Sequence, residues 1–149
     1  MSEGSYYLRL SGLLQRLIRN LHVQAYRPSL RQGVSLSGCR LLFLLRSGEP
    51  VEMNKIRKNL SVTGAFATSL ADQLVKHKLV VRQRNDMDRR KVTIMLTDKG
   101  KLYLAKLEAH RKQFFRVLVD GLKEEDKRTM ERGISILVDS LESMKNFNV

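Results

Sequence analysis

The chain has 149 residues, of which 42% are hydrophobic, and this supports a buried core for one domain of ordinary size. Lysine and arginine number 28 against 15 aspartates and glutamates, and the net charge of +13 favours a polyanionic partner such as nucleic acid, an anionic membrane surface or an acidic protein. No run approaches the ~20 apolar residues of a membrane span, the N-terminus lacks the pattern of a secretory signal, and the single cysteine excludes an internal disulfide. We therefore expect a soluble cytoplasmic protein without a membrane partner.

The first part of the chain predicts three helices. Apolar residues recur at helical spacing over residues 6–26, and Pro28 then interrupts the pattern. A hydroxyl of Ser35 or Ser37 is available as the N-cap of a short, largely buried helix in the segment LSGCRLLFLLRS. Residues 52–60 predict a third, small helix that turns its isoleucine and its last leucine inward.

The helix that follows has two contrasting faces. Thr63 is its predicted N-cap. The inward stripe consists of Ala67, Leu70, Ala71 and Leu74. The opposite face is small and polar and consists of Ala65, Thr68, Ser69, Asp72 and Gln73. Two short helices joined by a tight turn, with a small polar outer face on the second, have the layout of a helix-turn-helix.

A β-hairpin is predicted next, with strands at residues 80–84 and 92–96. The connection, NDMDRRK, is longer than a two-residue turn and mixes acids with bases. Residues 76–91 hold seven bases and two acids, whereas residues 120–132 hold four bases and five acids. Because exposed loops so often carry binding groups, this basic loop is a candidate contact element.

The C-terminal part predicts two longer helices. The first runs from about residue 98 to 119 and is capped by Thr97-Asp98, and acidic residues after Gly121 mark the start of the second. Apolar residues of the second helix are spaced four, three, four and three apart, as in a coiled coil; they are Met130, Ile134, Leu137, Leu141 and Met144. Packing inside one monomer is the alternative, but the apolar surface exceeds what a small winged domain needs, so we expect a helical dimer interface.

Three segments occur in an order that resembles a known family. They are LADQLVKHKLVVR (70–82), DRR (88–90) and LTDKG (96–100), and together they resemble the MarR family of transcription regulators. The resemblance implies a mainly α fold with a small β-hairpin wing (α+β). In it, a winged helix-turn-helix of about residues 35–97 lies between dimerisation helices of about residues 1–30 and 98–149.

The sequence departs from the family pattern at three places. Lys78 and Ser61 stand where the family has turn glycines, and Arg57 stands where it has a small residue. If Lys78 holds a left-handed backbone, the conformation costs about 1–2 kcal/mol; otherwise the turn is rearranged.

The resemblance also implies where DNA is contacted. The predicted DNA-binding residues are Thr63, Ala65, Phe66, Thr68, Ser69 and Gln73 on the helix and Arg82, Arg84, Asp88, Arg89, Arg90 and Lys91 on the wing. The helix enters the major groove, where base edges are distinguishable, and Arg90 enters the minor groove while Asp88 holds it in one pose. The alternatives are a core position for Phe66, a plain solvated face for Thr68 and Ser69, and a solvated turn residue for Asp88.

The function implied is that of a homodimeric, sequence-specific regulator of transcription. Such a protein binds double-stranded DNA at a pseudo-palindromic operator, more often as a repressor, and the family suggests control by a small aromatic or phenolic effector. Two alternatives remain: an architectural DNA-binding protein with little sequence preference, and a winged-helix module that binds an acidic protein.

Catalytic, metal and cofactor sites are not expected. His22, His77 and His110 are scattered and lack partners at metal-ligand spacing. Cys39 adjoins a buried stripe, which favours a small core residue over a redox-sensing thiol. We therefore expect neither an enzyme nor a cofactor.

Overall fold

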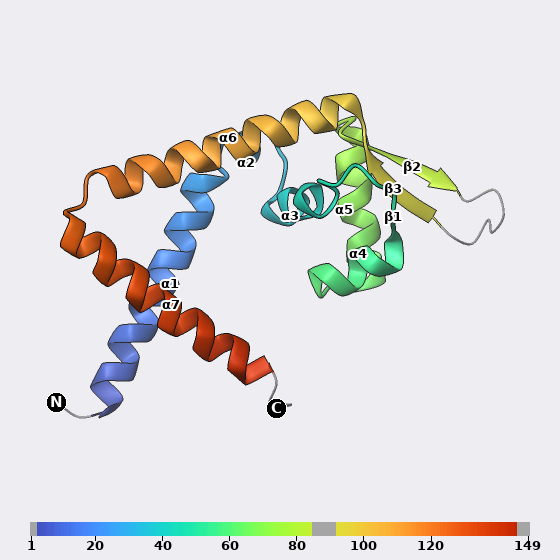
Figure 1. Ribbon diagram of the computed structural model, residues 1–149. Coiled ribbons are helices and arrows are strands. Elements are labelled where there is room, and N and C mark those ends of the chain that lie inside the picture. Colours follow the sequence, from blue (N-terminus) through green and yellow to red (C-terminus); the bar gives the residue numbers. More distant parts are fainter. Residues whose placement is uncertain (1–2, 85–91, 146–149) are drawn as a thin grey trace. The chain divides into compact units, whose positions relative to one another are not determined.

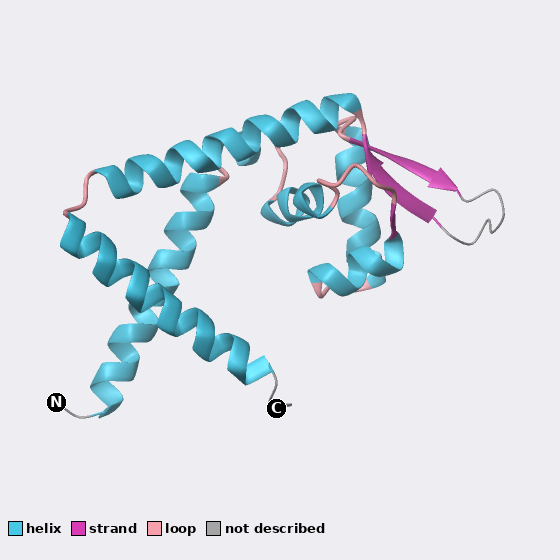
Figure 2. Ribbon diagram, viewed as in Figure 1, coloured by secondary structure: helices cyan, strands magenta, loops and turns pink. Residues whose placement is uncertain are grey.

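The computed structural model describes residues 3–84 and 92–145, with two compact units, Met1–Lys112 and Gln113–Val149. Figures 1 and 2 show a mainly helical chain with one small sheet, which confirms the predicted fold class. The elements in chain order are α1 (Glu3–Ala25), α2 (Arg27–Arg31), α3 (Leu36–Leu44), β1 (Val51–Glu52), α4 (Met53–Leu60), α5 (Gly64–Lys76), β2 (Val80–Arg84), β3 (Val92–Leu96), α6 (Asp98–Asp120) and α7 (Glu124–Lys145).

The core of the first unit is built from α3, α4 and α5 together with the sheet and the first half of α6. Its largest fully buried side chains include Leu41, Leu42, Leu45, Ile56, Leu74, Leu79 and Ile94. The predicted inward stripe of α5 is buried along its whole length. Ser35 caps α3 by accepting a hydrogen bond from the backbone N–H of Gly38 at 3.1 Å, as one of the two predicted serines. Burial of these stripes fixes α5 with its polar face outward.

The sheet is antiparallel and has the strand order β1-β3-β2. The two predicted hairpin strands are confirmed, with Val80 opposite Leu96 and Arg84 opposite Val92. The third strand, β1, pairs Val51 with Ile94 and was not predicted. Two residues are too few to show an alternating pattern, so only the pairing partner reveals this strand.

The chain after α1 also differs from the prediction. Helix α1 ends at Ala25, before Pro28 as expected, but Pro28 lies in the first turn of the new short helix α2 rather than in a simple break. Proline is favoured at this place, because the first-turn N–H that it lacks has no partner within a helix.

Two residues occupy the left-handed region of backbone conformation. Ser61 ends α4 with φ 54°, and Lys78 follows α5 with φ 60°. Of the two alternatives for Lys78, the left-handed backbone is therefore the one observed. The turn is not rearranged, and this conformation of a non-glycine residue costs about 1–2 kcal/mol. Arg57, the third departure, is exposed on α4, so its long side chain does not disturb the core.

The start of α6 is locked to the turn between α5 and β2. The hydroxyl of Thr97 donates to the carbonyl of Lys78 at 2.8 Å and accepts the backbone N–H of Gly100 at 2.9 Å. The Thr97 N–H donates to the carbonyl of Leu79 at 3.0 Å. Gly100 faces that same carbonyl, and a Cβ at this position would lie 1.9 Å from the oxygen. Only glycine therefore fits this contact.

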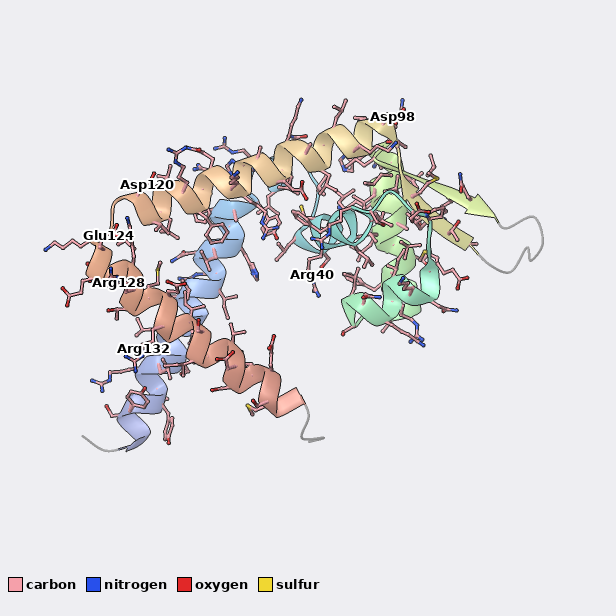
Figure 3. All side chains as sticks on the ribbon, in the orientation of Figure 1. Arg40, Asp98, Asp120, Glu124, Arg128 and Arg132 are labelled. Atoms are coloured by element: carbon pink, nitrogen blue, oxygen red, sulfur yellow. The ribbon has the colours of Figure 1, made fainter. Side chains whose placement is uncertain are left out.

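The second unit consists of the end of α6 and α7. Figure 3 shows Asp120 in the last turn of α6 and Glu124 in the first turn of α7; Arg116 pairs with Asp120, and Lys127 pairs with Glu124. Large apolar side chains on α7 remain exposed, among them Ile134, Leu141 and Met144. Among the described residues, no helix is both long and apolar enough to cross a membrane.

We expect Gly100→Ala to lower the free energy of unfolding by roughly 1–3 kcal/mol or more, because the added methyl overlaps the Leu79 carbonyl. Urea unfolding followed by circular dichroism measures this loss. Gly133→Ala is the control, since Gly133 is an exposed helical residue with nothing within 4 Å of an added Cβ. Equal stability of the two variants would contradict the close contact.

We expect Lys78→Gly to raise the free energy of unfolding by about 1 kcal/mol, because glycine adopts a left-handed backbone without the steric cost of a side chain. Lys76→Gly is the matched control: it exchanges the same residue pair within α5 and should lower stability, by at most about 1 kcal/mol. A loss of stability in Lys78→Gly would be inconsistent with this account.

Candidate nucleic-acid interface

The start of α5 is an exposed, capped helix end. The Thr63 hydroxyl accepts a hydrogen bond from the backbone N–H of Phe66 at 3.2 Å, which confirms the predicted cap. Ala65, Phe66, Thr68 and Ser69 are all exposed, so the predicted contact residues of the first two turns share an open surface. Phe66 is 47% exposed and is therefore not a core residue. This surface offers hydroxyls, methyls and one ring, but no charge.

Gln73 lies differently from these residues. Its amide donates to the carbonyl of Gly33 at 3.0 Å and accepts the hydroxyl of Ser35, also at 3.0 Å. It is half-buried, and it ties α5 to the loop that leads into α3. In this structure, Gln73 thus holds the position of the helix in addition to being a predicted base contact.

Arg82 joins the wing to α5. Its guanidinium pairs with the carboxylate of Asp72 at 2.8 Å and donates to the carbonyl of Thr68 at 3.3 Å. The two side chains are 38% and 59% exposed, so solvent screens this pair and its contribution to stability is small. The consequence of the pair is electrostatic. Asp72 is the one acid on the outer face of α5, and Arg82, which the sequence predicts as a DNA contact, neutralises its charge.

Of the other predicted wing residues, only the backbone of Arg84 belongs to the described part of the chain. Arg84 is the last residue of β2, but its side chain lies outside the described part. Asp88, Arg89, Arg90 and Lys91 also lie outside the described residues. The strands on both sides are described, and Arg84 pairs with Val92 at the end of the hairpin away from Leu96.

The structure has a groove beside α5 that the sequence did not predict. It has a volume of about 450 Å³ and lies between the start of α3 and the outer face of α5; its lining includes Ser35, Ser37, Phe66 and Ser69. The sequence predicts Phe66 and Ser69 as contact residues and a serine as a helix cap, but it does not show that they line one groove. The groove widens the polar surface around α5 to a second helix start.

Cys39 is fully buried, as predicted for a core residue. Burial raises the pKa of its thiol, and interactions with Ser29 and Arg111 oppose the shift only in part. A neutral, inaccessible thiol reacts slowly with oxidants. Among the described residues, no group of three or more histidines, cysteines and acids is arranged to hold a metal ion.

A capped helix with an open polar face, packed on a preceding short helix and followed by a β-hairpin, defines a winged helix-turn-helix protein. The family model "MarR family" matches residues 34–92. The HTH-type transcriptional repressor MdtR of Bacillus subtilis is 26% identical over 113 residues, which cover 76% of this chain and 73% of that protein.

Solved structures agree with this assignment. Streptococcus pneumoniae FabT, crystallised in complex with DNA, is 26% identical and superposes with a TM-score of 0.76. The match covers 93% of this chain and 99% of the FabT chain. MepR, a regulator of the Staphylococcus aureus efflux pump MepA, shares the fold with a TM-score of 0.76 at 22% identity, over 88% of this chain and 97% of its own. Residues 34–92 thus match a MarR-family winged helix-turn-helix, and nearly the whole chain shares the fold of these solved transcription regulators. The match is to a family of regulators and not of enzymes, in line with the sequence-based prediction.

We expect Gln73→Ala to lower the free energy of unfolding by roughly 1–2 kcal/mol, because it removes one hydrogen bond to Gly33 and one to Ser35. Ser69→Ala, on the exposed face of the same helix, should change stability by less than about 0.5 kcal/mol. Thermal unfolding of both variants measures the difference. A Gln73→Ala protein as stable as the parent would show that the two bonds contribute nothing.

Proposed function

We propose that this protein is a sequence-specific regulator that binds double-stranded DNA, acting as a homodimeric, ligand-responsive repressor at a pseudo-palindromic operator. The observation that carries the proposal is the open face of α5, on which Ala65, Phe66, Thr68 and Ser69 are exposed. The acid of this face, Asp72, is paired with Arg82. A major groove admits one α-helix, and hydroxyl and methyl groups distinguish base edges there.

The charge of the chain supplies affinity rather than discrimination. Its net charge of +13 attracts the phosphate backbone, and neutralising phosphates releases counterions. Binding should therefore weaken steeply as salt is raised. The wing residues Arg84, Arg89, Arg90 and Lys91 are proposed as the basic contacts, with Asp88 holding Arg90. The cytoplasm is the compartment in which such a partner would be met.

Dimerisation is proposed through α1, α6 and α7, which are taken as the dimerisation part around a DNA-binding part of about residues 35–97. Apolar side chains stand exposed on all three helices, among them Leu13, Ile18, Val117, Ile136 and Leu141. Several large apolar side chains exposed on one helix indicate an interaction site. Two-fold symmetry would place two copies of α5 at successive major-groove faces, with half-sites about one helical turn apart.

Repression rests on the relatives, and control by an effector rests on the resemblance to the family. The Bacillus subtilis protein is described as a repressor, and MepR regulates a multidrug efflux pump. A small aromatic or phenolic effector remains the proposed class of ligand for regulation.

Selection of bound DNA from a random pool at near-physiological salt tests the function. A palindromic consensus is the expected result. Enrichment of A·T content alone would instead support an architectural protein, which the uncharged face of α5 favours as the second candidate. Retention of no DNA would support a protein-binding module.

We expect Arg90→Ala to weaken binding to most sequences by roughly tenfold and to flatten the salt dependence by about one counterion, because a wing arginine contacts DNA without reading its bases directly. Fluorescence anisotropy over a series of salt concentrations measures both effects. Arg128→Ala on α7 removes the same charge and is the control. Unchanged operator affinity in Arg90→Ala would overturn the wing assignment.

Thr68→Ala and Ser69→Ala should act differently, since both residues lie on the exposed face of α5. We expect each to change the preference between operator variants by roughly 1–3 kcal/mol at one position, while binding to unrelated DNA stays the same. Competition binding with single-base operator variants measures this. A uniform loss across all sequences would assign these residues to phosphate contacts instead.

A further inference from the structure

The first turn of α5 presents an exposed apolar pair. Gly64, Ala65 and Phe66 follow the Thr63 cap, and all three are exposed. Phe66 is 47% exposed, whereas its neighbour Ala67 belongs to the buried stripe of the same helix. A single exposed ring on a protein surface is ordinary. Its place matters here, because the N-terminal residues of a recognition helix are those that contact base edges.

Side chains that read guanine and adenine are missing from this turn. In the major groove, arginine or lysine pairs with two atoms of guanine, and asparagine or glutamine pairs with two atoms of adenine. Within α5, only Gln73 and Lys76 are of these types. The Gln73 amide donates to the carbonyl of Gly33 and accepts the hydroxyl of Ser35, both at 3.0 Å, so it is already committed. Lys76 lies in the last turn, about 15 Å along the axis from Phe66.

The charged groups near the outer face of α5 are also engaged elsewhere. Asp72, which could accept from cytosine, is paired with Arg82 at 2.8 Å. Arg57 borders the first turn from α4, where its Cδ would lie 4.0 Å from a Cβ on Gly64. The helix before a recognition helix crosses the DNA backbone, which directs Arg57 to phosphate. Within the described residues, the first two turns of α5 therefore offer the bases hydroxyl and apolar groups.

The Phe66 ring has open space beside it. It lines the groove of about 450 Å³ between α5 and the start of α3, together with Ser35, Ser37 and Ser69. The hydroxyls of these serines accept or donate to either kind of base, so they discriminate weakly. The ring is the one large apolar group of this lining on the exposed first turn. Covering it with another apolar group removes its surface from water, which is favourable.

From these observations we infer that the first turn of α5 reads thymine, through contact of the Phe66 ring with the 5-methyl group of that base. The methyl group is the apolar feature that the major groove presents, and phenylalanine and alanine are among the side chains that contact it. Ala65 is the smaller apolar neighbour of the contact. The inference rests on the proposed function, because it names the base that the helix recognises.

Deoxyuridine tests the inference, because it pairs as thymidine does and lacks only the methyl group. The whole chain is titrated onto the operator obtained by selection, with one thymine at a time replaced by uracil, and fluorescence anisotropy gives each affinity. We expect one or two positions in each half-site at which uracil weakens binding about fourfold, the effect of burying one methyl group. Uracil at the other positions should leave affinity nearly unchanged.

Variants of Phe66 assign the effect to its ring. In Phe66→Ala, thymine and uracil operators should bind within about twofold of each other, because the short side chain no longer reaches the methyl group. Phe66→Leu should keep most of the preference. Val75→Ala is the matched control and should discriminate as the parent does. Val75 is 38% exposed on the same helix, and nine residues, or about two and a half turns, place it on the opposite flank. A merely structural role of Phe66 would weaken both operators equally.

The outcomes separate this inference from the proposed function. An operator bound equally well with thymine or uracil at every position would overturn the inference and leave the proposed function standing. A preference that persists undiminished in Phe66→Ala would overturn the assignment to this ring. Retention of no DNA, or enrichment of A·T content alone in the selection, would refute the proposed function and this inference together.

Discussion

The Leu79 carbonyl is the point on which the arrangement of the first unit depends. It accepts the backbone N–H of Thr97 and lies against Gly100, so that the start of α6 sits directly on the turn that leaves α5. The turn itself requires Lys78 in a left-handed conformation. Because a backbone contact this close has no room to adjust, α5, the hairpin and the long helix are fixed to one another within the first unit.

This junction gives the outer face of α5 a defined setting. Inward burial of its apolar stripe, the hydroxyl cap at Thr63 and the ties through Gln73 and Arg82 hold the helix on three sides. What remains exposed is nearly neutral, because Arg82 compensates Asp72. Under the proposed function, the basic hairpin would supply affinity through charge, and the polar face of α5 would discriminate between sequences through shape and hydrogen bonding.

Hydrogen bonds also connect α5 to the residues that line a pocket between α2 and α6. Lys99 serves both the pocket and the end of α5, and the loop after α2 serves both the pocket and Gln73.

The sequence by itself determined the described helices other than α2, both hairpin strands, a serine cap for α3, the cap at Thr63 and the buried stripe of α5, because each depends on local periodicity and local hydrogen bonding. It also indicated the polar face of α5. Only the tertiary structure decided that β1 exists, that Gln73 and Arg82 bond to neighbouring elements, and that lysines of α6 border a pocket with α2. The physical reason is that these features join residues far apart in the chain, and no periodic pattern within one segment records which distant partner will complete a strand, a hydrogen bond or a cavity.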